Sequence, residues 1–462
     1  IKKCARTYSN QLNLMEQYPE YTFVQSSAFH GEVIRRHYPE LFSRIQEKVA
    51  EGRYEPNGGV WVECDCNITS GESMVRQFLW GQRFTRKYFG FTSDAFWLPD
   101  TFGYSAAIPQ IMQGCGVKYF LTTKMAWNDT NQFPYDTFYW KGIDGTSVFS
   151  HLNKTHVWPA PKDFYQYVYS TQSPDAIRQK YVADRKLISY GFGDGGGGPQ
   201  YEMVEMARRC KDLEGCPKTE HTTVSRFMQE LEANVHNPDT YSGELYLELH
   251  RGTLTNQHNI KRNNRLAEIA LHDLEFLTVG NAVEAGAEAN DSQYRDLQET
   301  LLVNQFHDIL PGTCIPRAHK ESLEQTNALL ETSHKLIEAA AGTKAVENTV
   351  TVVNTTSFTR KETVYLDYVP GMRVQGGYAQ QVVETLKGEK KLAVAGVEIP
   401  PYGSVVLTLE AGEVGGDSSF RRNGAELETP FAKVSFDKKG YLSSFHDTVA
   451  DLELTGNGYA FN

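Results

Sequence analysis

Strand-like and helix-like segments alternate along residues 1–215 of this chain. The strand-like segments are short apolar runs at residues 21–25, 58–62, 95–98, 117–122 and 187–190. Helical patterns accompany these runs at residues 3–18, 30–51 and 109–113. A further helical pattern begins after Thr69 and Glu72, whose spacing is that of a capping box. Strands that alternate with helices run parallel to one another in most folds, so this part predicts an α/β sheet or barrel.

The pattern changes twice further along the chain. Residues 240–345 are almost wholly helical, with apolar stripes of helical period at residues 266–279 and 294–309 and a third helix at 322–341. From Val346 onwards the segments 349–354, 362–369, 397–409 and 431–445 have β character and are separated by glycines. A chain of 462 residues is too long for one hydrophobic core, so these changes indicate several domains.

Charge and cysteine content exclude some classes of function. The formal net charge is −11, which argues against a nucleic-acid partner because such a partner requires a concentrated basic face. No run of 18 apolar residues occurs, so no membrane-spanning helix is expected. The seven cysteines are too dispersed for a disulfide scaffold, and free thiols favour a reducing compartment. The pair Cys64 and Cys66 has no second cysteine cluster to complete a metal site, so a structural role is expected.

Two aspartates follow strand-like runs. Asp100 comes directly after the run 95–98, and Asp194 lies in the glycine-rich segment after the run 187–190. In barrel-type α/β folds the active site gathers at the carboxyl ends of the strands. Asp100 could instead cap the next segment, and the glycine-rich segment could be a flexible surface loop. A phosphate-binding loop does not fit, because Pro199 stands where that motif needs lysine.

His307 lies at the end of the second helical stripe. A histidine in a last helical turn interacts favourably with the helix dipole, so its position requires no function. As a metal ligand it would need a partner to orient its ring, and Asp308 beside it could serve as that partner.

Two carboxyl groups are sufficient for glycoside hydrolysis. One attacks the anomeric carbon and the other protonates the leaving oxygen, at a separation of about 5–5.5 Å in retaining enzymes. Asp100 and Asp194 both follow strand-like runs, so such a separation is feasible.

Several long motifs occur in one order along the chain. They are residues 62–78 (VECDCNITSGESMVRQF), 97–103 (WLPDTFG), 109–111 (PQI), 139–145 (YWKGIDG), 191–199 (GFGDGGGGP), 248–253 (ELHRGT) and 304–313 (NQFHDILPGT). Together they resemble glycoside hydrolase family 38, the α-mannosidases, and most closely its cytosolic, vacuolar and bacterial branch. The resemblance runs through the whole chain.

The resemblance implies an activity and a set of roles. The expected reaction is the retaining removal of terminal α-mannose residues from oligosaccharides, assisted by Zn²⁺ or Co²⁺. Asp100 matches the family's nucleophile, which is also a metal ligand, and His307 matches a second ligand. Asp194 lies in the region of the proposed acid/base residue. Asp65, Trp127 and Arg251 are expected substrate contacts, and Tyr104 and Phe192 flank the same motifs.

The resemblance also implies a multidomain fold of α/β, α and β parts. Residues 1–235 would form an irregular α/β barrel, 236–345 a three-helix domain, 346–412 a small β domain and 413–462 the start of a larger β-sandwich domain. The family's metal site also uses a His-x-Asp motif on the first strand, and neither His30 nor His37 has an aspartate two residues on. The chain is therefore expected to be a fragment, cut at both ends, that binds zinc poorly and has little activity.

Other interpretations stay open. A metal-dependent carbohydrate deacetylase would use similar ligands without a nucleophilic carboxylate, and a catalytically silent carbohydrate-binding protein would suit the β-rich last third. The expected partners are mannose-containing oligosaccharides, with neither nucleic acid nor membrane. Assembly into a homo-oligomer, linkage preference and a cytoplasmic or vacuolar (lysosome-like) compartment are left open by the sequence.

Overall fold

The computed structural model describes residues 1–173, 175–194, 196–289, 292–341, 346–415 and 419–455. Two compact units make up the chain, an N-terminal unit, Ile1–Ala340, and a C-terminal unit, Ala341–Asn462. Gly195 of the glycine-rich loop and the expected unfinished strand at Asn462 lie outside the described residues.

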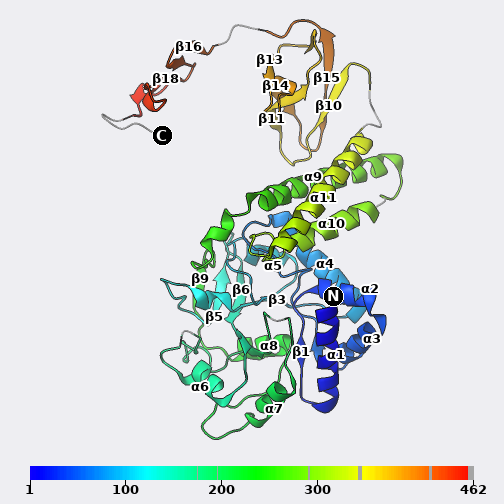
Figure 1. Cartoon of the computed structure of the whole chain (residues 1–462), viewed down its shortest axis with the longest axis vertical. Coiled ribbons are helices and arrows are strands. Elements are labelled where there is room, and N and C mark those ends of the chain that lie inside the picture. The colour runs from blue at the N-terminus through cyan, green and yellow to red at the C-terminus, as the bar shows by residue number, and fades with distance from the viewer. Residues whose placement is uncertain (174, 195, 290–291, 342–345, 416–418, 456–462) are drawn as a thin grey trace. The chain divides into compact units, whose positions relative to one another are not determined.

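A mixed five-stranded sheet lies at the centre of the N-terminal unit (Figure 1). Its order is β3 (Ala95–Leu98), β4 (Tyr119–Thr122), β6 (Ser147–Leu152), β5 (Thr137–Lys141) and β9 (Thr240–Ser242). The strands β3, β4 and β6 are parallel, and β5 is antiparallel to β6. The apolar runs 95–98 and 117–122 therefore form strands as predicted, within an α/β arrangement. Among the described strands this order is open, so a closed barrel is not seen.

Two short parallel pairs accompany this sheet. The strand β1 (Phe23–Val24) pairs with β2 (Tyr54–Glu55), and β7 (Lys154–Val157) pairs with β8 (Ile188–Tyr190). The run 58–62, predicted as a strand, makes only one bridge, between Val60 and Ser27. The backbone at Gly58 lies so close to its neighbour that a Cβ there would be 1.7 Å from the carbonyl oxygen of Ser26, so the position requires glycine.

Helices pack around these strands. They are α1 (Lys2–Gln17), α2 (Ala28–His37), α3 (Pro39–Ala50), α4 (Gly71–Phe89), α5 (Ile108–Gly114), α6 (Pro161–Tyr169), α7 (Tyr201–Arg209) and α8 (Val224–Asn234). The single helix expected over residues 30–51 is two helices, because Pro39 starts a new one. The capping residue of α4 is Ser70 rather than Thr69, and its hydroxyl accepts the N–H of Ser73.

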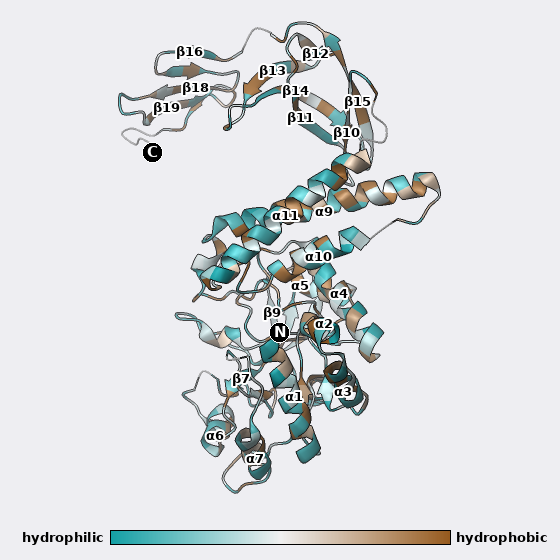
Figure 2. Ribbon diagram, turned by 45° about the vertical axis from the view of Figure 1, so that its right-hand side comes forward, coloured by the Kyte–Doolittle hydropathy of each residue, from teal (hydrophilic) through white to brown (hydrophobic). Residues whose placement is uncertain are grey.

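Three long helices form a bundle in the same unit. They are α9 (His258–Ala285), α10 (Ser292–Asn304) and α11 (Pro316–Ala341), and they share an apolar cluster that includes Leu271, Leu301 and Leu329. Hydrophobic and hydrophilic residues alternate along them in Figure 2, as expected for amphipathic helices. The second helix, α10, ends at Asn304. His307 therefore lies beyond its last turn, contrary to the prediction. Among the described residues, no helix has the length and apolar character needed to span a bilayer.

The C-terminal unit is built from strands. Its first part has two three-stranded sheets, formed by β10 (Thr349–Val353), β15 (Ser404–Ala411) and β12 (Met372–Val374), and by β11 (Arg360–Asp367), β14 (Lys390–Ile399) and β13 (Ala379–Glu384). One apolar cluster joins residues of both sheets, including Leu366, Val394 and Leu407. A further sheet contains β16 (Arg421–Asn423), β17 (Glu426–Glu428), β18 (Ala432–Phe436), β19 (Leu442–Asp447) and β20 (Leu452–Glu453). The segments 397–409 and 431–445 each contribute to two strands, because turns interrupt them.

Candidate active site

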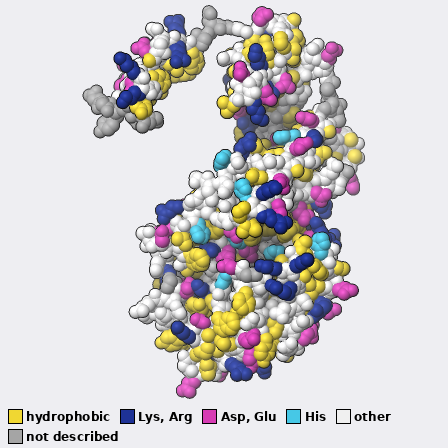
Figure 3. Space-filling model, in the orientation of Figure 1, with side chains coloured by type: hydrophobic (Ala, Val, Ile, Leu, Met, Phe, Trp, Pro, Cys, Tyr) yellow, Lys and Arg dark blue, Asp and Glu magenta, His cyan; other side chains and the backbone are white. Residues whose placement is uncertain are grey.

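Polar side chains follow the carboxyl ends of several strands in the N-terminal unit. Asp100 follows β3, Lys124 follows β4 and Asp194 follows β8, while Glu63 follows the bridge at Val60. Figure 3 shows acidic and histidine side chains gathered near the middle of this unit. In α/β folds ligands bind at the carboxyl ends of the strands. This rule selected Asp100 and Asp194 from the sequence, and it applies equally to Glu63 and Lys124.

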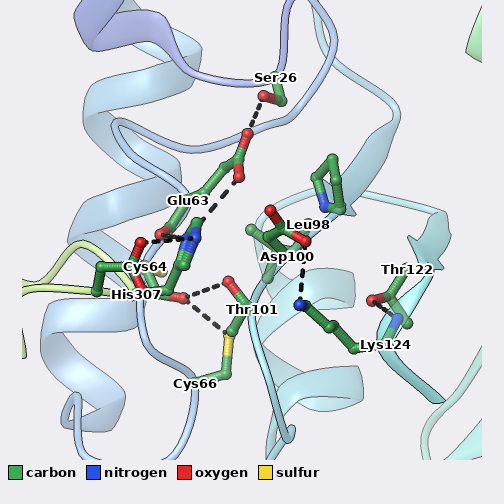
Figure 4. A network of polar contacts seen from close by, with 12 residues as sticks. Ser26, Glu63, Cys64, Cys66, Leu98, Asp100, Thr101, Thr122, Lys124 and His307 are labelled. Carbon is green, nitrogen blue, oxygen red and sulfur yellow. Dashed lines mark hydrogen bonds and ion pairs between the residues drawn. The ribbon is translucent and has the colours of Figure 1, made fainter. Parts of the chain in front are cut away.

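Asp100 is held by its neighbours along the chain and by a lysine. Its Oδ1 lies 3.2 Å from Nζ of Lys124, whose side chain is only 8% exposed. The next residue, Thr101, donates its hydroxyl hydrogen bond to the carbonyl oxygen of Cys64 at 3.1 Å. Figure 4 shows the Asp100 carboxylate turned toward Lys124. The carboxylate is therefore fixed on one side, while it keeps partial exposure to solvent.

His156 lies between the two aspartates selected from the sequence. Its Nε2 is 3.8 Å from Oδ2 of Asp100, and its Nδ1 is 3.7 Å from Oδ1 of Asp194. One ligand atom from each of these three residues lies within 4.8 Å of the others, a spacing that could hold a metal ion. The structure thus brings Asp100 and Asp194 together, and it adds a histidine that sequence reasoning missed.

His307 lies beside Glu63 rather than in the group formed by Asp100, His156 and Asp194. Its Nδ1 is 2.9 Å from the carbonyl oxygen of Glu63, so this nitrogen donates a hydrogen bond and Nε2 carries the free lone pair. Metal-bound histidines commonly have this backbone partner, so the buried ring suits a metal ligand.

Glu63 is the charged group that links both parts of the site. Burial raises the pKa of its carboxyl, and the nearby Asp100 raises this pKa further, whereas His307 and His156 lower it. The carboxyl also accepts a short hydrogen bond from Ser26 and points toward the ring of His307 (Figure 4). Because it interacts electrostatically with Asp100, His156 and His307, Glu63 belongs to the same polar centre.

Three other residues selected from the sequence have local partners. Asp308 lies 3.9 Å from Nε2 of His307 and accepts a hydrogen bond from the hydroxyl of Thr313. Asp65 is buried and accepts the N–H groups of Asn67 and Ile68, and its burial raises the pKa of its carboxyl. Arg251 donates to the carbonyl oxygen of Glu248 at 2.9 Å and is largely exposed.

Exposed aromatic rings lie near the residues that contact the two carboxylates in space or in sequence. Trp127 lies beyond Lys124, whose Nζ is 3.8 Å from the ring centre. Trp158 and Phe192 form an edge-to-face pair with ring centres 6.2 Å apart, and they are 38% and 44% exposed. They lie two residues after His156 and two before Asp194, respectively. Apolar ring faces next to carboxylates are typical of carbohydrate sites, whereas Tyr104 is fully buried in the core.

Comparisons with known proteins identify the family to which the chain is similar. Residues 1–244 match the family model described as the glycosyl hydrolases family 38 N-terminal domain, and residues 248–343 match the alpha mannosidase middle domain. The chain is 43% identical over 325 residues to Alpha-mannosidase G of Dictyostelium discoideum, which covers 70% of this chain and 29% of that protein. It is 41% identical over 348 residues to human Alpha-mannosidase 2C1, covering 74% of this chain and 33% of that protein.

The chain is thus much shorter than these curated relatives, of which it spans 29% and 33%. Among solved structures, an alpha-mannosidase from Enterococcus faecalis V583 superposes with a TM-score of 0.76 at 17% identity. That match covers 98% of this chain and 58% of the other. At this level of identity the superposition supports the fold.

Proposed function

Since the chain belongs to glycosyl hydrolase family 38, we propose that it carries the active site of a retaining α-mannosidase. The substrate class is oligosaccharides that end in α-linked mannose. The observation that carries the proposal is the approach of Asp100 and Asp194, whose carboxylate oxygens come within 4.8 Å of each other. This is compatible with the carboxyl separation of about 5–5.5 Å that retaining glycosidases require, and too short for the water that inverting enzymes place between them.

Each aspartate would have one role in a two-step reaction. An oxygen of Asp100 attacks the anomeric carbon as the glycosidic bond breaks, and the carboxyl group of Asp194 gives its proton to the departing oxygen. A water molecule then attacks the same carbon, Asp194 takes the proton of that water, and the bond to Asp100 breaks. Mannose leaves with its original anomeric configuration, and both carboxyl groups return to their starting states.

Lys124 supports the nucleophile in this scheme. Its ammonium group contacts Asp100 from a buried position, so it fixes the orientation of the carboxylate. An uncompensated buried ammonium would be costly, so Lys124 and Asp100 stabilise each other's positions.

Asp100 and His307 are the residues of this chain that we propose as metal ligands. A carboxylate and an imidazole with its other nitrogen bound to a carbonyl are donor types that suit zinc or cobalt, and they would supply two of the three protein ligands that a catalytic site needs. A bound ion of this kind would act as a Lewis acid and hold neighbouring sugar hydroxyls. Glu63 fixes the tautomer of His307 through its carbonyl oxygen.

We also propose a domain organisation for this activity. Residues 1–235 would belong to an irregular α/β barrel that carries both aspartates, and 236–345 would form a helical domain that supplies His307. Residues 346–412 and 413–462 would belong to β-sandwich domains. The strand ends that gather Asp100, Lys124 and Asp194 support the first part of this assignment.

A second function has one observation in its favour. The group formed by Asp100, His156 and Asp194 could itself hold a metal ion, as a carbohydrate deacetylase would require. In that case both aspartates would be ligands, and no covalent sugar would form on Asp100.

Trapping the intermediate tests the proposal. The full-length protein would be treated with a fluorinated α-mannosyl fluoride, which forms the intermediate faster than it is hydrolysed, and then digested for mass spectrometry. We expect a hexose-derived adduct on the peptide that contains Asp100, and none in the Asp100→Asn variant. Steady turnover of aryl α-mannosides without an adduct on Asp100 would exclude this nucleophile. Deacetylation without mannoside hydrolysis would favour the second function.

A further inference from the structure

The backbone of His156 has a conformation that side-chain-bearing residues rarely adopt. Its φ is 61°, in the left-handed region, at the point where the register of the β7–β8 pair is interrupted between Lys154 and Val157. Non-glycine residues in this region are strained, and they persist where the surrounding structure holds them, often at functional sites. The strain is therefore a reason to ask what the His156 ring does.

The glycine-rich loop packs directly on this ring. A Cβ atom at Gly193 would lie 2.1 Å from Nδ1 of His156, so only glycine leaves room for the imidazole. The loop itself is closed by hydrogen bonds from the N–H of Gly197 to Phe192 and from that of Gly196 to Gly193. The histidine and the loop that carries Asp194 are thus fitted to each other.

Asp194 has little other support. Its side chain is 89% exposed, and His156 is the only ion-pair partner that the described residues supply to it. The other ring nitrogen of His156 faces Asp100 at 3.8 Å. Both distances are longer than a direct hydrogen bond, so in this structure the ring is the nearest polar neighbour of each carboxyl group, and a small approach of either carboxyl group would bring it within hydrogen-bond distance.

We propose that His156 is a positioning residue that holds the carboxyl group of Asp194 on the leaving-group side of Asp100. The inference rests on the proposed glycosidase function and adds a residue to it. An exposed aspartate on a glycine loop would otherwise sample many positions, and proton transfer to the departing oxygen requires a fixed one. Loss of His156 should therefore impair acid assistance more than any other part of the reaction.

Leaving-group dependence tests this role in the full-length protein. A dinitrophenyl α-mannoside departs without protonation, whereas an α-linked mannobiose needs the acid. For His156→Ala we expect kcat/KM on mannobiose to fall about 10–100-fold more than on the dinitrophenyl substrate, since general acids contribute about 10²–10⁴-fold. Asp194→Ala should show the same pattern more strongly. His156→Gln, which retains a polar side chain of similar length, should recover part of the loss.

Gly193→Ala provides an independent variant, because it displaces the ring without removing it. It should reproduce the selective loss on mannobiose in a protein that still unfolds cooperatively, at a somewhat lower temperature because of the added methyl group, and with the zinc content of the parent protein. Equal losses on both substrates, or none, in folded His156→Ala and Gly193→Ala proteins would overturn the inference. If the parent protein hydrolysed neither substrate, the proposed function itself would fail. That outcome differs from a failure of the inference about His156, in which the parent protein hydrolyses both substrates.

Discussion

The Nζ atom of Lys124 lies 3.2 Å from Oδ1 of Asp100, and it is almost completely shielded from solvent. The ammonium group also faces the ring of Trp127, 3.8 Å from its centre. Such a contact is stronger than a surface ion pair because little water competes for the ammonium group. The pair therefore couples the end of β3 to the end of β4 at the carboxylate proposed to attack the sugar.

Replacing Lys124 should impair the nucleophile. The variant Lys124→Met keeps the length of the side chain but removes its charge and therefore its contact with Asp100, and a charge-assisted contact of this kind is worth about 1.5–3 kcal/mol. We expect kcat/KM for aryl α-mannosides to fall about 10–150-fold at pH 7, measured in the full-length protein. Lys124→Arg retains the charge and serves as the control. A Lys124→Met enzyme with the parent rate would show that Asp100 needs no partner.

Metal analysis should distinguish the two sets of ligands. If Asp100 and His307 hold the ion, His307→Ala should lower the zinc content of the dialysed full-length protein, because removal of a ligand weakens binding. His156→Ala should leave the zinc content unchanged. Mass-spectrometric metal analysis on both purified variants checks this prediction. The reverse result would place the ion among Asp100, His156 and Asp194.

Trp158 should contribute to recognition of the departing sugar. Its ring pairs with that of Phe192, which lies two residues before Asp194, the residue proposed to protonate the leaving group. Trp158→Ala should raise KM for mannobiose about 2–10-fold, the equivalent of about 0.5–1.5 kcal/mol of aromatic packing. Methyl α-mannoside has no second ring, so its KM should change little.

Local sequence signals predicted the strand 95–98 and the position of Asp100 because both depend on short-range properties. An apolar run predicts a strand, and Pro99 predicts where that strand ends, whatever the strand packs against. The structure places the strand at Ala95–Leu98. The same rule applied to the ends of the runs 58–62 and 117–122 would have selected Glu63 and Lys124. Neither residue has a role in the chemistry that the motifs imply, so no local signal marks it as functional.

Tertiary contacts explain what the sequence did not predict. The helical stripe continues to Ile309, but α10 ends at Asn304, because the following backbone pairs with residues near Glu63 through the N–H groups of Asp65 and His307. The left-handed conformation of His156 depends on Gly193, which is 37 residues away in sequence and leaves no periodic signal. Pairings between distant segments decide these features, and helical or strand periodicity does not report them.

His151 should make the stability of the N-terminal unit fall as the pH decreases. Burial, together with the nearby charge of Lys186, lowers the pKa of its imidazole from 6.5 to about 3. Its Nε2 accepts the N–H of Leu187 at 3.2 Å, and Nδ1 lies 3.0 Å from the hydroxyl of Thr137, so the folded state requires the neutral ring. The unfolded chain, by contrast, can take up the proton near pH 6.5.

The sign and size of the effect follow from this difference in pKa. Between pH 6.5 and pH 3 the unfolded state binds one more proton at this site, so the free energy of unfolding falls by about 1.4 kcal/mol for each pH unit on acidification. The glutamine side chain of a His151→Gln variant can still accept the N–H of Leu187, and it does not titrate. Between pH 6 and pH 5 the free energy of unfolding of this variant should therefore fall by about 1 kcal/mol less than that of the parent protein. Urea unfolding followed by tryptophan fluorescence measures this, since all six tryptophans lie within Ile1–Ala340. Parallel pH profiles for the parent chain and the variant would show that His151 is not the group responsible.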